Sequence, residues 1–239
     1  MKKRKGLWIA AAILLTLAIA VAVYAGDYYR AEEAAVAAMA GSDTVTVEQA
    51  GNLTVFAPQS PEAGFIFYPG GKVEHTAYAP LLLELAQENI LCVLVQMPLN
   101  LAVLDMDAAE GIPEKYPEIK SWYIGGHSLG GSMAASYAAE NAEGLDGLVL
   151  LAAYSTADLK STDLEVLSIY GSEDRVLNME KYQQYRPNLP ETTWEWVIDG
   201  GNHALFGSYG PQEGDGEAAI SGEVQLTVTV QNLLELINN

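Results

Sequence analysis

Apolar runs without an alternating polar face recur along this chain, separated by stretches with helical spacing. The run at 90–97, "ILCVLVQM", is typical of a strand that is buried on both sides of a sheet. Strands separated by helices of about 10–15 residues indicate β-α-β units, in which successive strands lie parallel. We therefore predict an α/β fold with a mainly parallel sheet flanked by helices. The strands of this part are expected at 64–69, 90–97, 121–126, 146–154, 164–171 and 192–199.

A hairpin is predicted ahead of these strands, because two β-rich runs flank Gly51 and Asn52, a pair typical of tight turns. Its two strands bring the predicted sheet to eight. Residues 44–239 are numerous enough to form one domain with a full core. Residues 26–43 are alanine-rich, and we expect them to form a helical stalk. The remaining helices are expected at 77–89, 99–110, 129–142, 178–186 and 223–237.

The first 25 residues have the pattern of a membrane segment. Four cations in the first five residues precede residues 7–25, a stretch without any charge. At about 1.5 Å per residue, a helix of this length can cross a bilayer. It is also longer than the apolar core of a secretory signal, about 7–15 residues. We predict an N-terminal transmembrane helix that leaves the rest of the chain outside the cytoplasm. The alternative is a signal that is cleaved after Ala25 and releases a secreted domain.

The rest of the chain is strongly acidic. Residues 26–239 carry eight cations against 31 anions, a balance that repels nucleic acid, so no nucleic-acid partner is expected. Cys92 is the only cysteine, which excludes an intramolecular disulfide and speaks against a thiolate metal site. We expect neither a metal nor a cofactor.

Residues 126–130 form the pattern Gly-x-Ser-x-Gly between a predicted strand, "SWYI", and a predicted helix. The pattern alone is weak, because short motifs occur by chance. Its position between a strand and a helix is more specific, since a nucleophilic serine occupies a sharp turn at that place. The start of the helix also directs unpaired N–H groups toward developing negative charge. We interpret Ser128 as a nucleophile.

A serine nucleophile needs a base, and the chain has three histidines. His203 directly follows the last strand in a glycine-rich loop, where α/β sheets carry chemistry, and we predict it as the base. His127 lies inside the turn itself, so its side chain should point away from Ser128 and serve packing or hydrogen bonding. His75 follows a glycine turn, where a surface role competes with a place in the cleft.

Asp174 is the predicted acid, because it comes three residues after the strand at 164–171. It would accept the second N–H of the base and fix its tautomer. Glu173 is the neighbouring alternative, and Asp199 lies too close to His203 along the chain. The resulting order, Ser then Asp then His, matches that of α/β-hydrolases and differs from two other familiar triad orders.

Acyl transfer also needs donors for the oxyanion. The backbone N–H of Leu129, directly after the serine, is the first candidate. The second is the N–H of Gly71 in "YPGGKV", where two glycines allow close approach of the backbone to a ligand. Lys72 is a neighbouring possibility, although a solvated side chain is the simpler interpretation.

These residues stand in longer stretches, namely "FYPGGKVEHTAYAPLL", "VQMPLNLAVLD", "IGGHSLGGSMAA", "GSEDRV" and "GGNHALFGSYGPQEGDG". Through them the chain resembles the α/β-hydrolase superfamily over residues 44–238, and most closely the small bacterial group called α/β-hydrolase fold-5. The resemblance implies Ser128 as nucleophile, Asp174 as acid and His203 as base. It does not extend to the N-terminal segment.

Many lipases and esterases insert a lid before the strand that carries the acid. Here only residues 155–163 fill that interval, so no large lid is expected and the site should be open. Phe206 and Tyr209 are candidates for a partial wall that binds substrate, or equally for packing residues.

The combined prediction is a membrane-tethered, extracytoplasmic serine hydrolase that cleaves an ester or related acyl bond of a small molecule. The same constellation would serve an amide, thioester or dienelactone hydrolase, because function depends on the pocket. A non-catalytic envelope protein that retained the fold is a further alternative.

Overall fold

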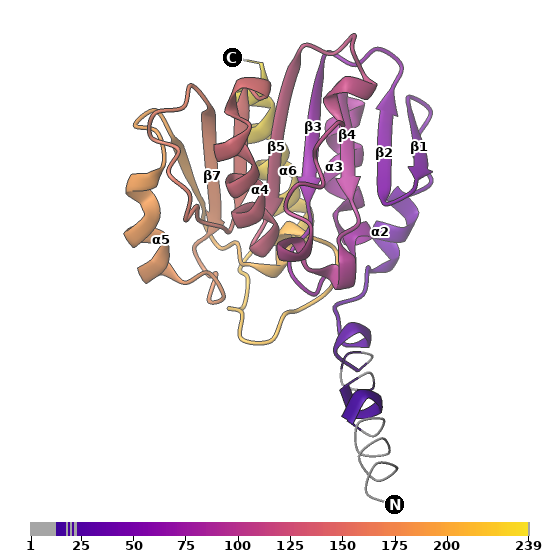
Figure 1. Cartoon of the computed structure of the whole chain (residues 1–239), viewed down its shortest axis with the longest axis vertical. Coiled ribbons are helices and arrows are strands. Elements are labelled where there is room, and N and C mark those ends of the chain that lie inside the picture. Colours follow the sequence, from indigo (N-terminus) through magenta and orange to yellow (C-terminus); the bar gives the residue numbers. More distant parts are fainter. Residues whose placement is uncertain (1–12, 18, 20, 22, 239) are drawn as a thin grey trace, which may run out of the picture.

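Eight strands form one sheet in the computed structural model, which describes residues 13–17, 19, 21 and 23–238 (Figure 1). Their order across the sheet is β1-β2-β4-β3-β5-β6-β7-β8. β1 and β2 form an antiparallel hairpin, β2 is antiparallel to β4, and the remaining neighbours are parallel. The predicted, mainly parallel sheet is thus confirmed. The strands are β1 (Val45–Ala50), β2 (Leu53–Pro58), β3 (Ala63–Tyr68), β4 (Ile90–Val95), β5 (Ser121–His127), β6 (Gly147–Leu151), β7 (Glu165–Gly171) and β8 (Trp194–Ile198).

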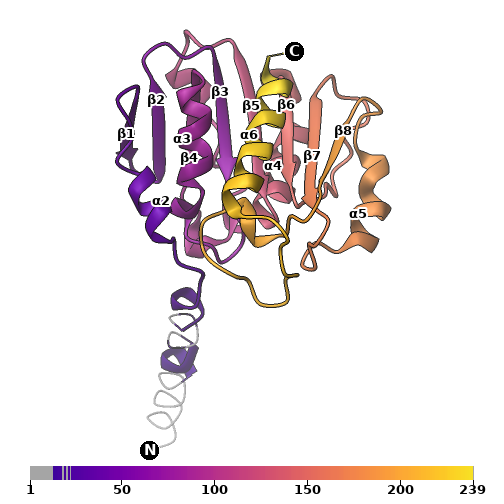
Figure 2. The same cartoon turned by 180° about the vertical axis from the view of Figure 1, so that it is seen from behind.

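Helices cover both faces of this sheet. α3 (Ala79–Gln87) and α6 (Gly222–Ile237) lie on one face, whereas α4 (Leu129–Glu140) and α5 (Met179–Tyr185) lie on the other (Figures 1 and 2). Along β3, Phe65 and Phe67 join the core under α3 and α6, while Ile66 joins the core under α4. Because side chains alternate between two buried faces, the central strands have no polar face.

The stretch at 99–110, predicted as a helix, is instead a loop with short 3-10 turns at Pro98–Asn100 and Ala102–Leu104. Leu99 and Asn100 have φ values of 52° and 55°, and two successive left-handed residues interrupt an α-helix. Hydrogen bonds to a distant side chain also replace helical ones, since the Tyr68 hydroxyl accepts from the Ala109 N–H and donates to the Met106 carbonyl, both at 2.8 Å.

The predicted stalk also differs from expectation. Within residues 27–43 only α2 (Glu33–Ala38) is helical, and the residues between 27 and α2 run along the domain without helical structure. Tyr29 forms a parallel bridge with Val73, its N–H donates to the Lys72 carbonyl at 2.8 Å, and its carbonyl accepts from the Glu74 N–H at 2.9 Å. The segment is therefore part of the folded body: its alanine-rich residues form α2, and the residues before α2 pair with the backbone of a distant loop.

The predicted membrane anchor at 1–25 lies largely outside the described residues, which lack 1–12, 18, 20 and 22. Residues 13–17 and 23–26 are helical. Within the described part of the chain, no helix has the length and apolarity that crossing a membrane requires. Residues 155–163 contain no helix or strand, in agreement with the predicted lack of a large lid.

Replacing Tyr68 by Phe tests how the loop after β4 is held. The change leaves the Ala109 N–H and the Met106 carbonyl without their partner, so we expect the free energy of unfolding to fall by about 1–3 kcal/mol. Urea denaturation measures it. The matched control is Tyr170→Phe, since the Tyr170 hydroxyl makes no hydrogen bond to any described residue. Equal losses in the two variants would contradict this account.

Candidate active site

Ser128 occupies the turn between β5 and α4 in a strained conformation. Its φ and ψ are 53° and −120°, outside the regions that residues with a side chain ordinarily adopt. Its N–H donates to the Leu151 carbonyl of β6 at 2.9 Å, which fixes the turn above the carboxyl edge of the sheet. This geometry presents the hydroxyl at the edge where the loops after the parallel strands meet.

Small residues make this turn possible. A Cβ on Gly126 would lie 2.5 Å from the Tyr68 carbonyl oxygen, and one on Gly130 would lie 2.2 Å from the same atom. Contacts under 3 Å are not tolerated, so α4 approaches β3 and β5 this closely only without side chains at both positions. The glycines of the motif therefore allow the close packing of helix on sheet that fixes Ser128.

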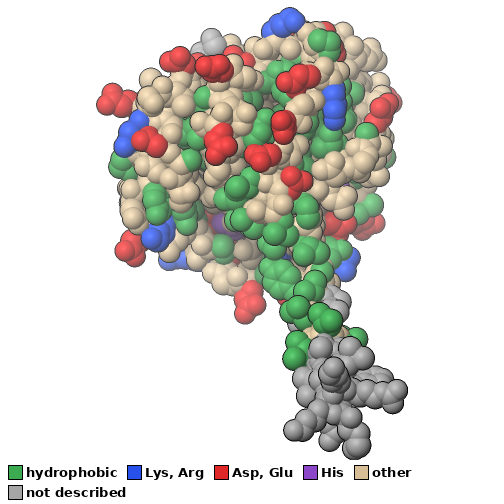
Figure 3. Space-filling model, viewed as in Figure 1, with side chains coloured by type: hydrophobic (Ala, Val, Ile, Leu, Met, Phe, Trp, Pro, Cys, Tyr) green, Lys and Arg blue, Asp and Glu red, His purple; other side chains and the backbone are tan. Residues whose placement is uncertain are grey.

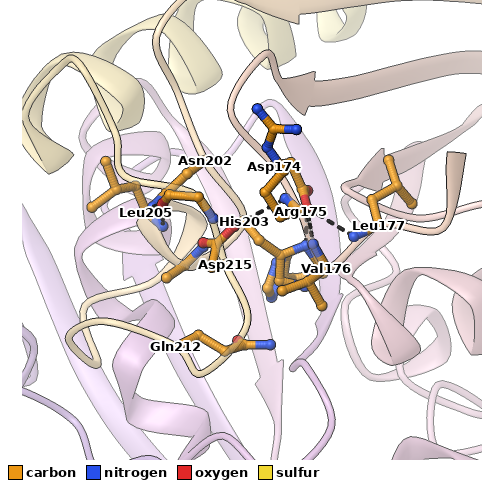
Figure 4. A network of polar contacts seen from close by, with 12 residues as sticks. Asp174, Arg175, Val176, Leu177, Asn202, His203, Leu205, Gln212 and Asp215 are labelled. Carbon is orange, nitrogen blue, oxygen red and sulfur yellow. Dashed lines mark hydrogen bonds and ion pairs between the residues drawn. The ribbon is translucent and has the colours of Figure 1, made fainter.

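Asp174 and His203 form a buried pair across the loops that follow β7 and β8 (Figure 4). Asp174 Oδ2 and His203 Nδ1 are 2.8 Å apart, and each side chain is 1% exposed. The other carboxylate oxygen, Oδ1, accepts from the N–H groups of Val176 and Leu177, both at 2.8 Å. The carboxylate thus holds Nδ1–H as a donor and leaves Nε2, which is buried and has no partner among the described residues, as an acceptor.

A pocket of about 240 Å³ brings the predicted nucleophile and base together. Ser128 and His203 both line it, and its mouth is open to solvent. A larger hollow of about 810 Å³ is lined mainly by residues from 160–166 and 186–194, at the opposite end of the strands and away from this pair. The remaining walls of the smaller pocket are Leu129, Ser132, Ala152, Ala153, Tyr154, Val176, Leu177 and Asn178.

The loop after β3 lies against the residue that follows the nucleophile. A Cβ on Gly71 would be 3.0 Å from Leu129 Cδ2, so the two predicted oxyanion donors belong to adjacent segments. The neighbouring amides are occupied, since Gly70 N–H donates to the Tyr78 hydroxyl at 3.0 Å and Lys72 N–H to the Asn100 carbonyl at 2.8 Å. The N–H of Gly71 makes no hydrogen bond to a described residue. As the first residue of α4, Leu129 likewise has no acceptor within its helix.

His127 supports this loop from inside the protein. Its side chain is buried, and Nδ1 lies 2.8 Å from the Tyr78 hydroxyl, which accepts from Gly70. With Gly70 N–H donating to its oxygen, the Tyr78 hydroxyl has its own proton available for Nδ1 in the tautomer that carries its proton on Nε2. Burial, helped by the nearby His203 ring, lowers the pKa of His127 well below its usual value, so the imidazole is neutral. The predicted packing and hydrogen-bonding role of His127 agrees with this placement.

Asp215 is an organising residue that sequence reasoning did not identify. Its Oδ2 accepts from the Ala204 N–H at 2.9 Å, and its Oδ1 accepts from the Arg175 N–H at 3.2 Å (Figure 4). One carboxylate thus joins the residue after the base to the residue after the acid. The acidic, glycine-rich run "PQEGDG" around it has the composition of a solvated loop and offers no signal of this role.

Gln225 of α6 provides a second support that the sequence did not reveal. This fully buried side chain accepts from the Asn202 N–H at 3.0 Å through Oε1 and donates to the Asn202 carbonyl at 2.8 Å through Nε2. Both backbone groups of the residue before His203 are therefore fixed by the last helix. In sequence, Gln225 is only a polar residue on an amphipathic helix.

Phe206 and Tyr209, predicted as a possible substrate wall, are packing residues. They are 4% and 5% exposed and line no part of the pocket with Ser128. Their rings pack beneath the site, with the Phe206 ring centroid 5.7 Å from that of His127 and the Tyr209 centroid 6.4 Å from that of Tyr78. The loop turns these side chains inward because the apolar rings gain more by burial than by facing an open pocket.

The other candidates stay apart from this centre. His75 is half-buried in a 3-10 turn, and burial lowers its pKa. Cys92 is buried in β4, and burial raises the pKa of its thiol well above the usual value. Across the described residues, no group of three or more His, Cys, Asp or Glu side chains is arranged to hold a metal ion.

Comparison with known proteins gives a family match over a range that contains Ser128, Asp174 and His203. The profile described as "Alpha/beta hydrolase family" matches residues 64–227, more than half of the chain. A comparison with curated proteins found no significant match.

Solved structures share this fold at low identity. TT1662 from Thermus thermophilus is 14% identical with a TM-score of 0.61, over 82% of this chain and 99% of that one. A dienelactone hydrolase from Anabaena variabilis is 15% identical with a TM-score of 0.56, over 80% of this chain and 94% of its own. Carboxyl esterase 2 from Tuber melanosporum is 11% identical with a TM-score of 0.60, over 88% and 91%.

Replacing Asp215 by Asn tests the connection between the acid and base loops. The amide keeps one acceptor but turns an NH₂ group toward the other backbone N–H. Because a hydrogen bond to a charged acceptor is worth about 1.5–3 kcal/mol, we expect kcat/KM for a short ester to fall about tenfold or more. The control is Glu213→Gln, an exposed side chain in the same loop. Equal kcat/KM values for wild type and D215N, measured on folded protein, would show that the loops hold without this carboxylate.

Proposed function

The chain belongs to the alpha/beta hydrolase family, and on this premise we propose that it is a serine hydrolase that cleaves an ester or related acyl bond. The observation that carries the proposal is the shared pocket, in which a strained serine and a histidine with a free, buried Nε2 lie together. The histidine is oriented by a carboxylate, as general-base catalysis on a hydroxyl requires.

In the proposed reaction, His203 Nε2 takes the proton of Ser128 while Oγ attacks the acyl carbon. Asp174, whose oxygens accept from two backbone N–H groups and from His203, stabilises the imidazolium. The N–H groups of Leu129 and Gly71 receive the oxyanion. His203 then gives its proton to the leaving group, and water releases the acyl chain through the same steps in reverse.

The other titratable groups near the pocket do not fit the role of base. The Nδ1 atom of His127 is occupied by the Tyr78 hydroxyl, and His127, unlike His203, does not line the pocket that holds Ser128. His75 makes no contact with Ser128 or His203 among the described interactions. Of the three histidines, His203 is therefore our candidate for the base, since it lines the pocket with Ser128 and its Nδ1 is paired with a carboxylate.

We favour an ester as the substrate, and the open pocket without a large lid gives such a molecule direct access to Ser128. Two of the similar structures bear the names carboxyl esterase and dienelactone hydrolase, and both act on esters by name. At 11–15% identity these similarities support only the fold. That this chain cleaves an ester is our own proposal.

A fluorophosphonate probe tests the nucleophile, since it labels an activated serine. We expect wild type to be labelled at Ser128, and Ser128→Ala to lose the label together with about 10⁴-fold or more of kcat on p-nitrophenyl acetate. The control is Ser136→Ala, two turns along the same helix. Folded wild-type protein that is neither labelled nor active on ester, thioester and amide substrates would favour a non-catalytic role for this fold.

We also propose that residues 1–25 tether the domain to a membrane, with the domain outside the cytoplasm. The support is the sequence, in which four cations precede an uncharged run at 7–25. Tethering keeps the mass at 25.6 kDa, whereas cleavage after Ala25 would shorten the chain.

Membrane fractionation tests the tether. We expect the expressed full chain to sediment with membranes, to resist alkaline extraction and to be degraded by protease added outside the cytoplasmic membrane. A variant with Leu14→Lys and Leu17→Lys should lose resistance to extraction, because charge at the centre of an apolar segment costs about 2.5–3.5 kcal/mol per residue. Intact chain in the soluble fraction, or a mature N-terminus at Gly26 by mass spectrometry, would rule out an uncleaved anchor.

A further inference from the structure

Exposed apolar side chains gather at the end of the molecule that carries the pocket. In the loop after β4, Leu99, Val103, Leu104 and Met106 are 46%, 50%, 54% and 40% exposed. This loop follows the carboxyl end of β4, and the Ser128 turn follows the carboxyl end of the parallel β5. Four large apolar side chains in one solvated loop are costly unless another surface covers them.

The loop presents these side chains in a fixed conformation. Leu99 and Asn100 have left-handed backbones, which leucine rarely adopts. The Asn100 carbonyl accepts from Lys72 N–H at 2.8 Å, Ala102 is 1% exposed, and Tyr68 holds the backbone at Met106. An exposed leucine that is kept in a strained backbone indicates a contact outside the folded chain rather than a mobile loop.

A second apolar surface adjoins this loop through Lys72. The Lys72 ammonium pairs with Asp27 at 2.5 Å and lies 4.9 Å above the Tyr24 ring, while its backbone N–H binds Asn100. We use the name N-terminal helical segment for the described helical residues at 13–17, 19, 21 and 23–26. Tyr24 belongs to this segment, and Asp27 follows directly after it. Figure 3 shows hydrophobic side chains gathered where this segment joins the domain, beside a hollow in which a histidine is visible.

The apolar side chains of the N-terminal helical segment point in all directions around its axis. Ile13, Leu14 and Leu15 are 62%, 66% and 63% exposed, although consecutive helical residues face about 100° apart. A helix that binds a protein groove has one apolar stripe and a polar opposite face. Apolar exposure on every side is matched by lipid, which surrounds a helix.

We propose that the loop at 98–106 and the N-terminal helical segment form one lipid-contacting surface, which sets the mouth of the Ser128 pocket against a membrane. The surface should be uncharged lipid, because Asp105 and Asp107 lie in the same loop and the chain as a whole is acidic. The path from pocket to surface is short, running from Ser128 and Leu129 through Gly71 to Lys72 and Asn100.

A substrate class follows, and it rests on the proposed hydrolase function. An open pocket held at the bilayer surface receives its substrates from the lipid phase, so the acyl compounds it meets at highest concentration are membrane-soluble esters with long chains. The lack of a large lid is consistent with this, since the membrane itself covers the mouth.

Spin labelling tests the surface without using catalysis. Cys92 is buried, so labels can be placed by Val103→Cys in the loop and by Val197→Cys, 45% exposed in β8, as the control. In full-length protein reconstituted into phosphatidylcholine vesicles, we expect collisions of the 103 label with a water-soluble nickel complex to fall severalfold and collisions with oxygen to rise. The 197 label should remain as in water.

Three outcomes would overturn this inference. The 103 label could be as accessible to nickel as the 197 label, or the full-length protein could fail to float with the vesicles. In the absence of vesicles, the protein could also form a dimer in which the 103 label is immobilised. A second copy of the chain, rather than lipid, would then cover the loop.

Kinetics tests the substrate class separately. In the variant with Leu99→Asn, Val103→Ser and Leu104→Ser, we expect kcat/KM for a long-chain ester embedded in the vesicles to fall about tenfold, a difference of about 1.4 kcal/mol. The value for p-nitrophenyl acetate in water should stay unchanged. The control is Trp196→Ser, 50% exposed on β8. Equal losses on both esters would contradict the substrate class. If the 103 label is protected but no ester is cleaved, the hydrolase proposal fails and the lipid surface stands.

Discussion

The close approach of α4 to the sheet is the constraint on which the site depends. Because Gly126 and Gly130 have no side chains, the helix begins almost on top of the β3 backbone, and the chain must turn within one residue. That residue is Ser128, whose unusual φ and ψ are the cost of this turn. The same packing places the first amide of the helix beside the loop at Gly71, so one contact positions both the hydroxyl and the candidate oxyanion donors. A side chain at either glycine would move all of them together.

The histidine and its carboxylate depend on hydrogen bonds that start far away in sequence. Burying a carboxylate is costly unless its oxygens are paired, and those of Asp174 accept two backbone N–H groups and His203. Asp215 joins the two loops that carry this pair, and Gln225 fixes the loop before the histidine. The His127 ring packs against the His203 imidazole, with ring centroids 4.5 Å apart, and Phe206, which was expected at the substrate, packs against His127 instead. The geometry of this candidate site is held by packing and backbone hydrogen bonds before any ligand arrives.

The N-terminal segment takes part in the same construction. Residues expected to form a stalk pair with the backbone of the loop after β3, through Tyr29 and Lys72, and Glu32 N–H donates to the Ser208 carbonyl in the loop that follows His203. The beginning of the chain and the two loops of the site are therefore mechanically connected.

By itself, the sequence determined the α/β class, the eight strands and the positions of Ser128, Asp174 and His203 at strand ends. Buried strands need uninterrupted apolar residues, and tight turns need glycine, so both leave local patterns. The helix expected at 99–110, the free stalk and the wall of Phe206 and Tyr209 were not found, because distant backbone partners and burial decided those segments. Asp215, Gln225 and the pair of Tyr78 with His127 have no local pattern at all. Only the tertiary structure decided them, since a hydrogen bond between residues far apart in sequence forms only after folding has brought the donor and the acceptor together.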